Sequence, residues 1–260
     1  MDVRQQTSRQ FLVSNWSLTD HIAEIGLVLA ILAGITAILS GLGTQWGWWY
    51  FRTGIKLLRV GAISGAIAAV VSLGGVGSVV VRHERRATNV FAATAGILIG
   101  LLTVGIPWSW AHEAERLPSI HDITTDMINP PQFRAIIPLR VDAVNSAVYG
   151  GQEIASQQMR AYPDIRPLSL SVSPITAFNK ALITAKNMNW RIIDSNTKEG
   201  RIEAVATTFW FGFKDDIVIR VTPEFKGSRV DIRSTSRVGR SDIGTNAERV
   251  RTFLKNMMKE

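Results

Sequence analysis

Three apolar stretches in the first 110 residues constrain this chain more than any other feature. They cover residues 25–42, 60–81 and 89–110, and none of them contains an ionisable side chain. Each is long enough to cross the hydrocarbon core of a bilayer as a helix, which takes about 20 residues. The sequence therefore predicts an α-helical membrane anchor over residues 1–111, with three transmembrane helices at about 22–43, 60–81 and 89–110.

After residue 110 the composition changes to that of a soluble domain. The net charge of +8 is shared equally, because residues 1–111 and residues 112–260 each carry an excess of four cations. The second half mixes both signs and contains no block of like charge, which argues against a nucleic-acid partner. The chain has no cysteine, so disulfides and a cysteine-based zinc site are excluded.

The cations in the short loops predict the orientation of the anchor. With three spans, five cations fall on one face of the membrane and three on the other; the five are Arg4, Arg9, Arg82, Arg85 and Arg86, and the three are Arg52, Lys56 and Arg59. Positive loops favour the cytoplasmic side. We therefore predict a multi-pass protein of the bacterial inner membrane, with a cytoplasmic N-terminus and a periplasmic C-terminal domain.

The interiors of the spans carry only serine and threonine as polar side chains. Pumps and coupled transporters generally need an intramembrane ionisable group, so transport is not expected. Small residues in the pairs Gly61/Gly65 and Gly96/Gly100 indicate close helix packing. The two pairs fit packing within one chain, and they also fit a homo-oligomer.

The polar half has an irregular first part. Residues 112–166 contain several prolines, which disfavour helix, so an extended segment is predicted, with one short helix at about residues 152–162.

Residues 167–260 follow a regular pattern that predicts an α+β domain. Alternating apolar residues predict a strand at 168–172, and Ser173 and Pro174 are an N-cap and first position for a helix that ends near Trp190. Four strands are predicted at residues 191–194, 202–209, 217–222 and 229–234. Thr245 and Glu248 have the spacing of a capping box that opens a last helix. This order predicts an antiparallel sheet with two helices packed on one face, similar in order to helix-grip folds.

Five separated segments closely resemble the domain of unknown function 1499 family. They are residues 120–126 (IHDITTD), 129–133 (NPPQF), 161–165 (AYPDI), 207–216 (TTFWFGFKDD) and 236–246 (SRVGRSDIGTN). The resemblance extends over residues 117–256, and the three spans before it are similar to those of bacterial envelope members. It implies an architecture and a location but no established reaction.

The first candidate site is the run from Thr207 to Asp216. Its aromatic residues could line the mouth of an apolar ligand site while the charged residues bind a polar head; the candidates are Trp210, Phe211, Phe213, Lys214, Asp215 and Asp216. The alternative is the edge of a hydrophobic core closed by a charged hairpin.

The second candidate site is the loop before the last helix. Arg237 and Arg240, with Asp242 and Asn246, could hold a phosphate or carboxylate at the helix N-terminus. The alternative is that Asp242 and Asp231 pair with these arginines and hold the loop in place.

His121, Asp122 and Asp126 are weaker candidates for acid/base chemistry or metal binding. A hydrolase would need them, with Ser241 as nucleophile, but no nucleophile elbow surrounds any serine. We therefore expect no catalytic residue, no metal and no cofactor.

The sequence predicts a non-catalytic domain that binds a lipid-like ligand or an envelope protein. One alternative is an envelope enzyme that uses the His121/Asp122 segment, and another is a structural subunit of a membrane complex.

Overall fold

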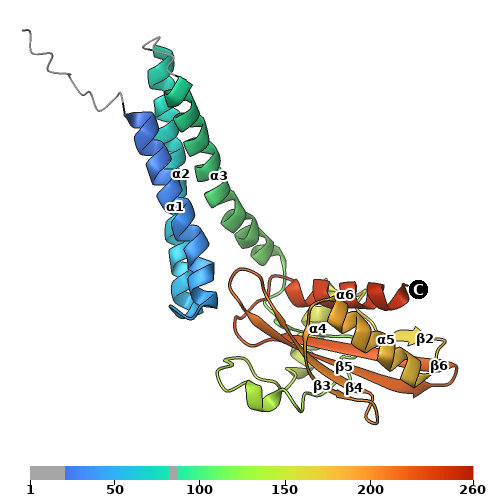
Figure 1. The fold of residues 1–260 in the computed structure, drawn as a ribbon. Coiled ribbons are helices and arrows are strands. Elements are labelled where there is room, and N and C mark those ends of the chain that lie inside the picture. Colours follow the sequence, from blue (N-terminus) through green and yellow to red (C-terminus); the bar gives the residue numbers. More distant parts are fainter. Residues whose placement is uncertain (1–20, 82–86, 260) are drawn as a thin grey trace, which may run out of the picture. The chain divides into compact units, whose positions relative to one another are not determined.

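The computed structural model describes residues 21–81 and 87–259, with the side chains of residues 78–87 excluded (Figure 1). The five cations on which the orientation mainly depends, at positions 4, 9, 82, 85 and 86, lie outside the described residues. The chain divides into two compact units. Among the described residues, those up to 38 and those between 57 and 106 form the first, and residues 39–56 and 107–259 form the second.

Three helices form the N-terminal part of the chain. They are α1 (Ile22–Gln45), α2 (Phe51–Val81) and α3 (Ala87–Arg116), and each contains a segment long and apolar enough to span a membrane. The three predicted spans are therefore confirmed as apolar helices. Both α2 and α3 extend beyond them, so that Arg52 lies in the first turn of α2 and Arg116 in the last turn of α3.

Glycines allow the three helices to approach closely. A Cβ atom at Gly61 would lie 3.1 Å from the backbone nitrogen of Ala37 in α1, and one at Gly65 would lie 3.1 Å from the carbonyl oxygen of Gly100 in α3. At Gly96 it would lie 3.1 Å from the backbone nitrogen of Leu27. Both glycine pairs thus pack against helices of their own chain, as small residues do in membrane bundles. A homo-oligomer through these glycines stays a prediction.

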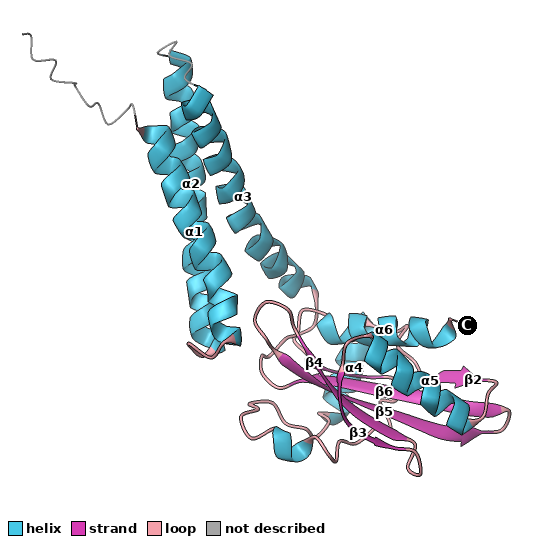
Figure 2. Ribbon diagram, viewed as in Figure 1, coloured by secondary structure: helices cyan, strands magenta, loops and turns pink. Residues whose placement is uncertain are grey.

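The second unit is built on one antiparallel sheet (Figure 2). Its strand order is β1-β6-β5-β4-β3, and β2 also pairs with β6. The elements are β1 (Asp122–Thr124), the 3₁₀ helix η2 (Ile137–Leu139), α4 (Gly151–Ala161), β2 (Leu168–Leu170), α5 (Pro174–Asn187), β3 (Arg191–Asn196), β4 (Arg201–Thr207), β5 (Lys214–Glu224), β6 (Gly227–Ser236) and α6 (Thr245–Met258). The predicted α+β fold with an antiparallel sheet and helices is confirmed.

The prediction was incomplete in the proline-containing segment. Asp122 to Thr124 form a strand there, β1, which pairs with residues 233–235 of β6. Three residues are too few to show an alternating pattern, so β1 depends on its partner strand. The helix predicted at about 152–162 is α4.

One face of the sheet is covered by helices and holds the main hydrophobic core. Every second residue of β4, β5 and β6 belongs to this core, because successive side chains of a strand point to opposite faces of the sheet. Ile217, Ile219 and Ile232 are fully buried there, together with Phe253 of α6. Helices α5 and α6 contribute further fully buried residues, such as Ala181 and Val250, and Ile154 of α4 packs against the same cluster. The space between sheet and helices is therefore filled by side chains.

The start of α5 follows the predicted chemistry. Ser173 is the N-cap, its hydroxyl accepts a hydrogen bond from the backbone N–H of Thr176, and Pro174 takes the first helical position. Replacing Ser173 by alanine should lower the free energy of unfolding by about 1 kcal/mol, because that N–H loses its acceptor. Urea unfolding of the full-length chain would measure the change. Ser171→Ala, an exposed serine outside any helix, is the matched control and should have little effect.

The start of α6 corrects a prediction. Gly244, with φ 75°, is the N-cap, and Thr245 is already helical, so the capping box was wrong. The carboxylate of Asp242 instead accepts hydrogen bonds from the backbone N–H groups of Gly244 (3.0 Å) and Asn246 (2.7 Å). A carboxylate in the preceding loop therefore does the capping, and a glycine takes the left-handed position at low steric cost.

Candidate functional site

The sheet face opposite the helices carries charged side chains. We call it the charged face; its residues alternate with those of the main core along β4, β5 and β6, with Arg237 just after β6, and are Arg201, Glu203, Asp216, Arg220, Arg229, Asp231, Arg233 and Arg237. Residues 125–148, which we call the strap, cover this face. Phe133 and Ile136 of the strap are buried against Val205 and Val218 of the sheet. Except for η2, the strap has no regular secondary structure.

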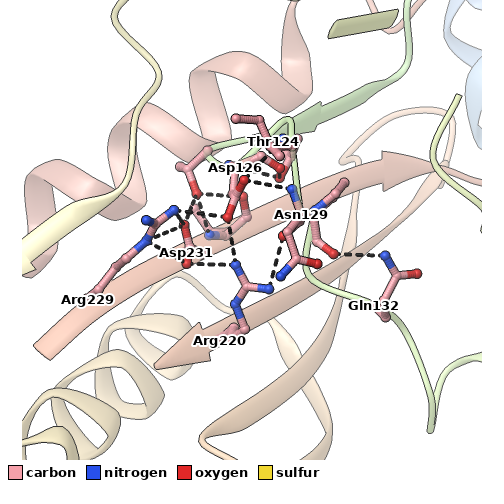
Figure 3. A network of polar contacts seen from close by, with 11 residues as sticks. Thr124, Asp126, Asn129, Gln132, Arg220, Arg229 and Asp231 are labelled. Atoms are coloured by element: carbon pink, nitrogen blue, oxygen red, sulfur yellow. Dashed lines mark hydrogen bonds and ion pairs between the residues drawn. The ribbon is translucent and has the colours of Figure 1, made fainter. Parts of the chain in front are cut away.

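Asp126 fixes the beginning of the strap. Its carboxylate lies 3.0 Å from guanidinium nitrogens of both Arg220 and Arg229, and the same two arginines lie 2.9 and 3.0 Å from Asp231 (Figure 3). The Asp231 carboxylate raises the pKa of Arg229 by hydrogen bonding. Arg220 also donates a hydrogen bond to the carbonyl oxygen of Asn129 (3.0 Å). The first turn of the strap is thereby tied to β5 and β6.

Arg233 connects both ends of the strap from beneath. Its guanidinium forms a bidentate pair with Asp122 (2.9 and 2.7 Å) and donates to the carbonyl oxygens of Pro131 (3.3 Å) and Ala147 (2.9 Å). The rings of Phe133 and Tyr149 lie 5.0 and 5.4 Å from the same guanidinium, within cation–π range. Arg233 is fully buried, so its contacts with Asp122 and Pro131 are shielded from water, while the contact with Ala147 is partly buried.

Two carboxylates fix the middle of the strap. Glu203 of β4 accepts hydrogen bonds from the consecutive backbone N–H groups of Arg134, Ala135 and Ile136 (2.8, 3.1 and 2.8 Å), and it also pairs with Arg201. Asp216 of β5 binds two guanidinium groups, from Arg140 of the strap and from Arg237, which directly follows β6. Arg237 in turn donates to the carbonyl oxygen of Leu139 (2.7 Å).

The outer side of the strap presents aliphatic side chains among exposed polar ones such as Arg134 and Asp142. Ile128 is 99% exposed, Val141 88% and Val148 76%, and the exposed strap aliphatics in full are Ile128, Ile137, Leu139, Val141, Val144 and Val148. Aliphatic side chains clustered in exposed positions are typical of surfaces that meet another macromolecule. The ion pairs beneath hold this irregular segment in one conformation, so the apolar side chains are displayed on a fixed surface.

The aromatic run is split between core and solvent. Phe211 is buried and stacks on Phe213 at 5.3 Å, whereas Phe209 is exposed. The ring of Trp210 packs edge-on against Phe211. The three charged residues that follow do not converge, because Lys214 is exposed, Asp215 pairs with Arg249 of α6, and Asp216 lies on the charged face.

The loop before α6 does not bring its two arginines together. Arg237 is bound to Asp216 and Leu139, while Arg240 is exposed and its side chain forms no hydrogen bond or ion pair with a described residue. Asn246 is fully buried and bonds the hydroxyls of Ser234 (2.6 Å) and Ser236 (2.9 Å). Burial raises the pKa of Asp242, whose carboxylate is occupied by the backbone N–H groups of α6.

The side chains of the His121 segment also form structural hydrogen bonds and an ion pair. Asp122 is the partner of Arg233, and Nδ1 of His121 lies 3.2 Å from the carbonyl oxygen of Arg240. Ser241 accepts a hydrogen bond from the backbone N–H of Ile243. Among the described residues, no group of three or more metal-ligating side chains is placed to hold a metal ion. This arrangement favours a structural role for the segment over an acid/base site.

The strap, with Glu203, Arg220 and Arg233 beneath it, was missed from the sequence. A signal was present, because residues 229, 231, 233 and 237 place charges at alternate positions of a strand. Such a pattern indicates a charged sheet face. Eight charged residues on one face indicate that another segment of the chain covers them and supplies their hydrogen-bond and ion-pair partners.

Fold and site together define a protein with three candidate membrane spans and an α+β domain whose sheet is covered by an ion-paired strap. Residues 122–257 match the family described as protein of unknown function (DUF1499), and the chain belongs to this family. The match confirms the resemblance found in the sequence, and it begins at β1 and includes the strap and most of α6. A search of curated proteins finds no match.

Proposed function

We propose that this is a bacterial inner-membrane protein whose periplasmic domain binds an envelope protein through the outer side of the strap, without catalysis. The three apolar helices support the membrane location. The predicted orientation, with a cytoplasmic N-terminus, puts the strap in the periplasm.

The exposed aliphatic side chains of the strap carry the proposal. An irregular segment that is held by buried ion pairs loses little conformational entropy when a partner binds, because its order was established on folding. Buried ion pairs are a weak source of stability but can favour one conformation over others. A protein-binding surface needs one fixed conformation. A segment that only covers the sheet does not need it.

A protein partner fits this surface better than a lipid inside the domain. The core between the sheet and the helices is filled by residues such as Ile217, Ile219 and Phe253, each fully buried. A chain-like apolar ligand would have to displace them. The strap, by contrast, carries six exposed aliphatic side chains within residues 128–148, outside the core.

Replacing Val141, Val144 and Val148 together by serine should reduce the amount of partner recovered with the tagged full-length protein by at least about tenfold, because the apolar contact area is lost. Quantitative mass spectrometry after gentle solubilisation of cells would measure it. The strap backbone should keep its place, since none of the three side chains holds it to the sheet.

Phe225→Ser is the matched control. Phe225 is 96% exposed at the turn between β5 and β6, whereas Asn145 and Ala147 of the strap contact Ser236 and Arg233, toward the other end of β6. Recovery of the partner should not change with this variant. Equal losses for both variants, or no loss for the triple variant, would contradict docking through the strap.

A further inference from the structure

A second surface lies where the last span ends. A groove of about 690 Å³ is lined by residues of the last turn of α3, the following loop and α4; these are Arg116, Pro118, Glu153, Ser156, Gln157, Arg160 and Ala161. All of them belong to the second unit of the chain. None of them belongs to the strap or to the charged face.

The sequence of α4 explains why its groove side is polar. Glu153, Ser156, Gln157 and Arg160 have the i, i+3, i+4, i+7 spacing of one helix face. Residues on the other side, such as Ala155 and Gln158, are buried. Helix α4 therefore presents one polar stripe to the groove and one buried stripe to the domain.

The charged side chains in the groove have no partner among the described residues. Most arginines of the domain are bound by carboxylates or carbonyl oxygens, but Arg116, Arg160 and Glu153 form no hydrogen bond or ion pair with any residue that the structure describes. Arg116 and Arg160 are exposed. Two free guanidinium groups in one groove suit a phosphate, which arginine can bind through paired N–H donors.

The position of Arg116 along α3 points to the source of the phosphate. Arg116 follows Trp110 by six residues of the same helix, so it lies about 9 Å farther along the helix axis. Trp108 and Trp110 close the apolar stretch, and tryptophan is favoured at the edge of the hydrocarbon core. The headgroup layer adds roughly 5–8 Å on each side of that core, so the backbone of Arg116 lies just at its outer boundary and the long side chain can reach back to the lipid headgroups.

We propose that this groove binds the headgroup of a zwitterionic phospholipid, with its phosphate on Arg116 and Arg160 and its ammonium group on Glu153. Basic pockets beside membrane spans are known to bind the phosphates of lipid headgroups. The single carboxylate selects a headgroup that carries an amine over a purely anionic one. This inference goes beyond the proposed docking of a protein on the strap, and it depends only on α3 being a membrane span.

Native mass spectrometry of the full-length protein, presented with equal amounts of phosphatidylethanolamine and phosphatidylglycerol in detergent, tests the groove. The wild-type protein should retain phosphatidylethanolamine preferentially. Arg116→Gln/Arg160→Gln should retain about tenfold less of either lipid, since two charged hydrogen-bond donors are lost. Glu153→Gln should keep phospholipid but lose the preference.

Arg166→Gln/Arg191→Gln removes the same charge from exposed positions outside the groove and should retain lipid as the wild type does. Inorganic phosphate at millimolar concentration should not displace the lipid; displacement would mean a site for free anions. The proposal is overturned by that result, by equal losses in the two double variants, or by undiminished lipid in Arg116→Gln/Arg160→Gln. The serine variants of the strap should retain lipid, so this test and the test of protein docking fail independently.

Discussion

Replacing Arg233 by methionine should lower the free energy of unfolding of the second unit by about 3–5 kcal/mol, the cost of leaving a buried charge without its partner. The Asp122 carboxylate would stay buried and lose both of its hydrogen bonds from the guanidinium. The carbonyl oxygens of Pro131 and Ala147 would lose a donor at the same time. Methionine fills a similar volume, so a cavity contributes little to the effect.

Pulse proteolysis of the full-length protein in a urea series measures this change without relying on the fluorescence of the membrane tryptophans. Arg191→Met, at an exposed position of β3, is the control and should shift stability by no more than about 0.5 kcal/mol. Adding Asp122→Leu to Arg233→Met should recover a large part of the loss, since no unpaired charge is then left in the interior. Equal effects of Arg233→Met and Arg191→Met would contradict a clamp at this position.

Replacing Glu203 by alanine should cost about 3 kcal/mol or more and release the middle of the strap. Three consecutive backbone N–H groups lose their acceptor, and unsatisfied buried donors cost about 1–3 kcal/mol each. Hydrogen exchange at residues 134–136 should accelerate more than exchange in β5. Glu203→Gln keeps one acceptor oxygen and should give an intermediate effect.

Glu199→Ala is the matched control for this experiment. Glu199 also contacts Arg134 and Arg201, but it is partly exposed, and exposed pairs contribute about 0–1 kcal/mol. Its loss should leave exchange at residues 134–136 nearly unchanged. If Glu203→Ala accelerates exchange no more than Glu199→Ala, the carboxylate of Glu203 does not hold the strap.

Elements set by local chemistry could be predicted from the sequence. Three uninterrupted apolar runs predict spans, because a helix satisfies its own backbone in lipid. Ser173 and Pro174 fix the beginning of α5 through contacts within one turn, and alternating residues predict β4 to β6. The capping box at Thr245 failed because Asp242, outside the pattern, reaches the same backbone donors.

The strap could not be predicted in the same way, because its order depends on contacts between distant residues. Asp122 and Arg233 are 111 positions apart, and Glu203 meets the backbone of residues that lie 67–69 positions before it. Proline content predicts an extended chain but not where it lies. For the same reason the binding residues proposed from adjacency, Asp215 and Asp216, point to opposite faces of one strand and bind different partners.

Labelling of single cysteines in intact cells shows on which side of the membrane the domain lies and whether a partner covers the strap. The chain offers a clean background because it contains no cysteine. A membrane-impermeant maleimide should label Phe225→Cys, whose position is exposed and in the periplasm in our account. It should label Val144→Cys, on the strap, only after denaturation has removed the partner protein. No labelling of Phe225→Cys in intact cells would place the domain on the cytoplasmic side, and equal labelling at both positions would mean that nothing covers the strap.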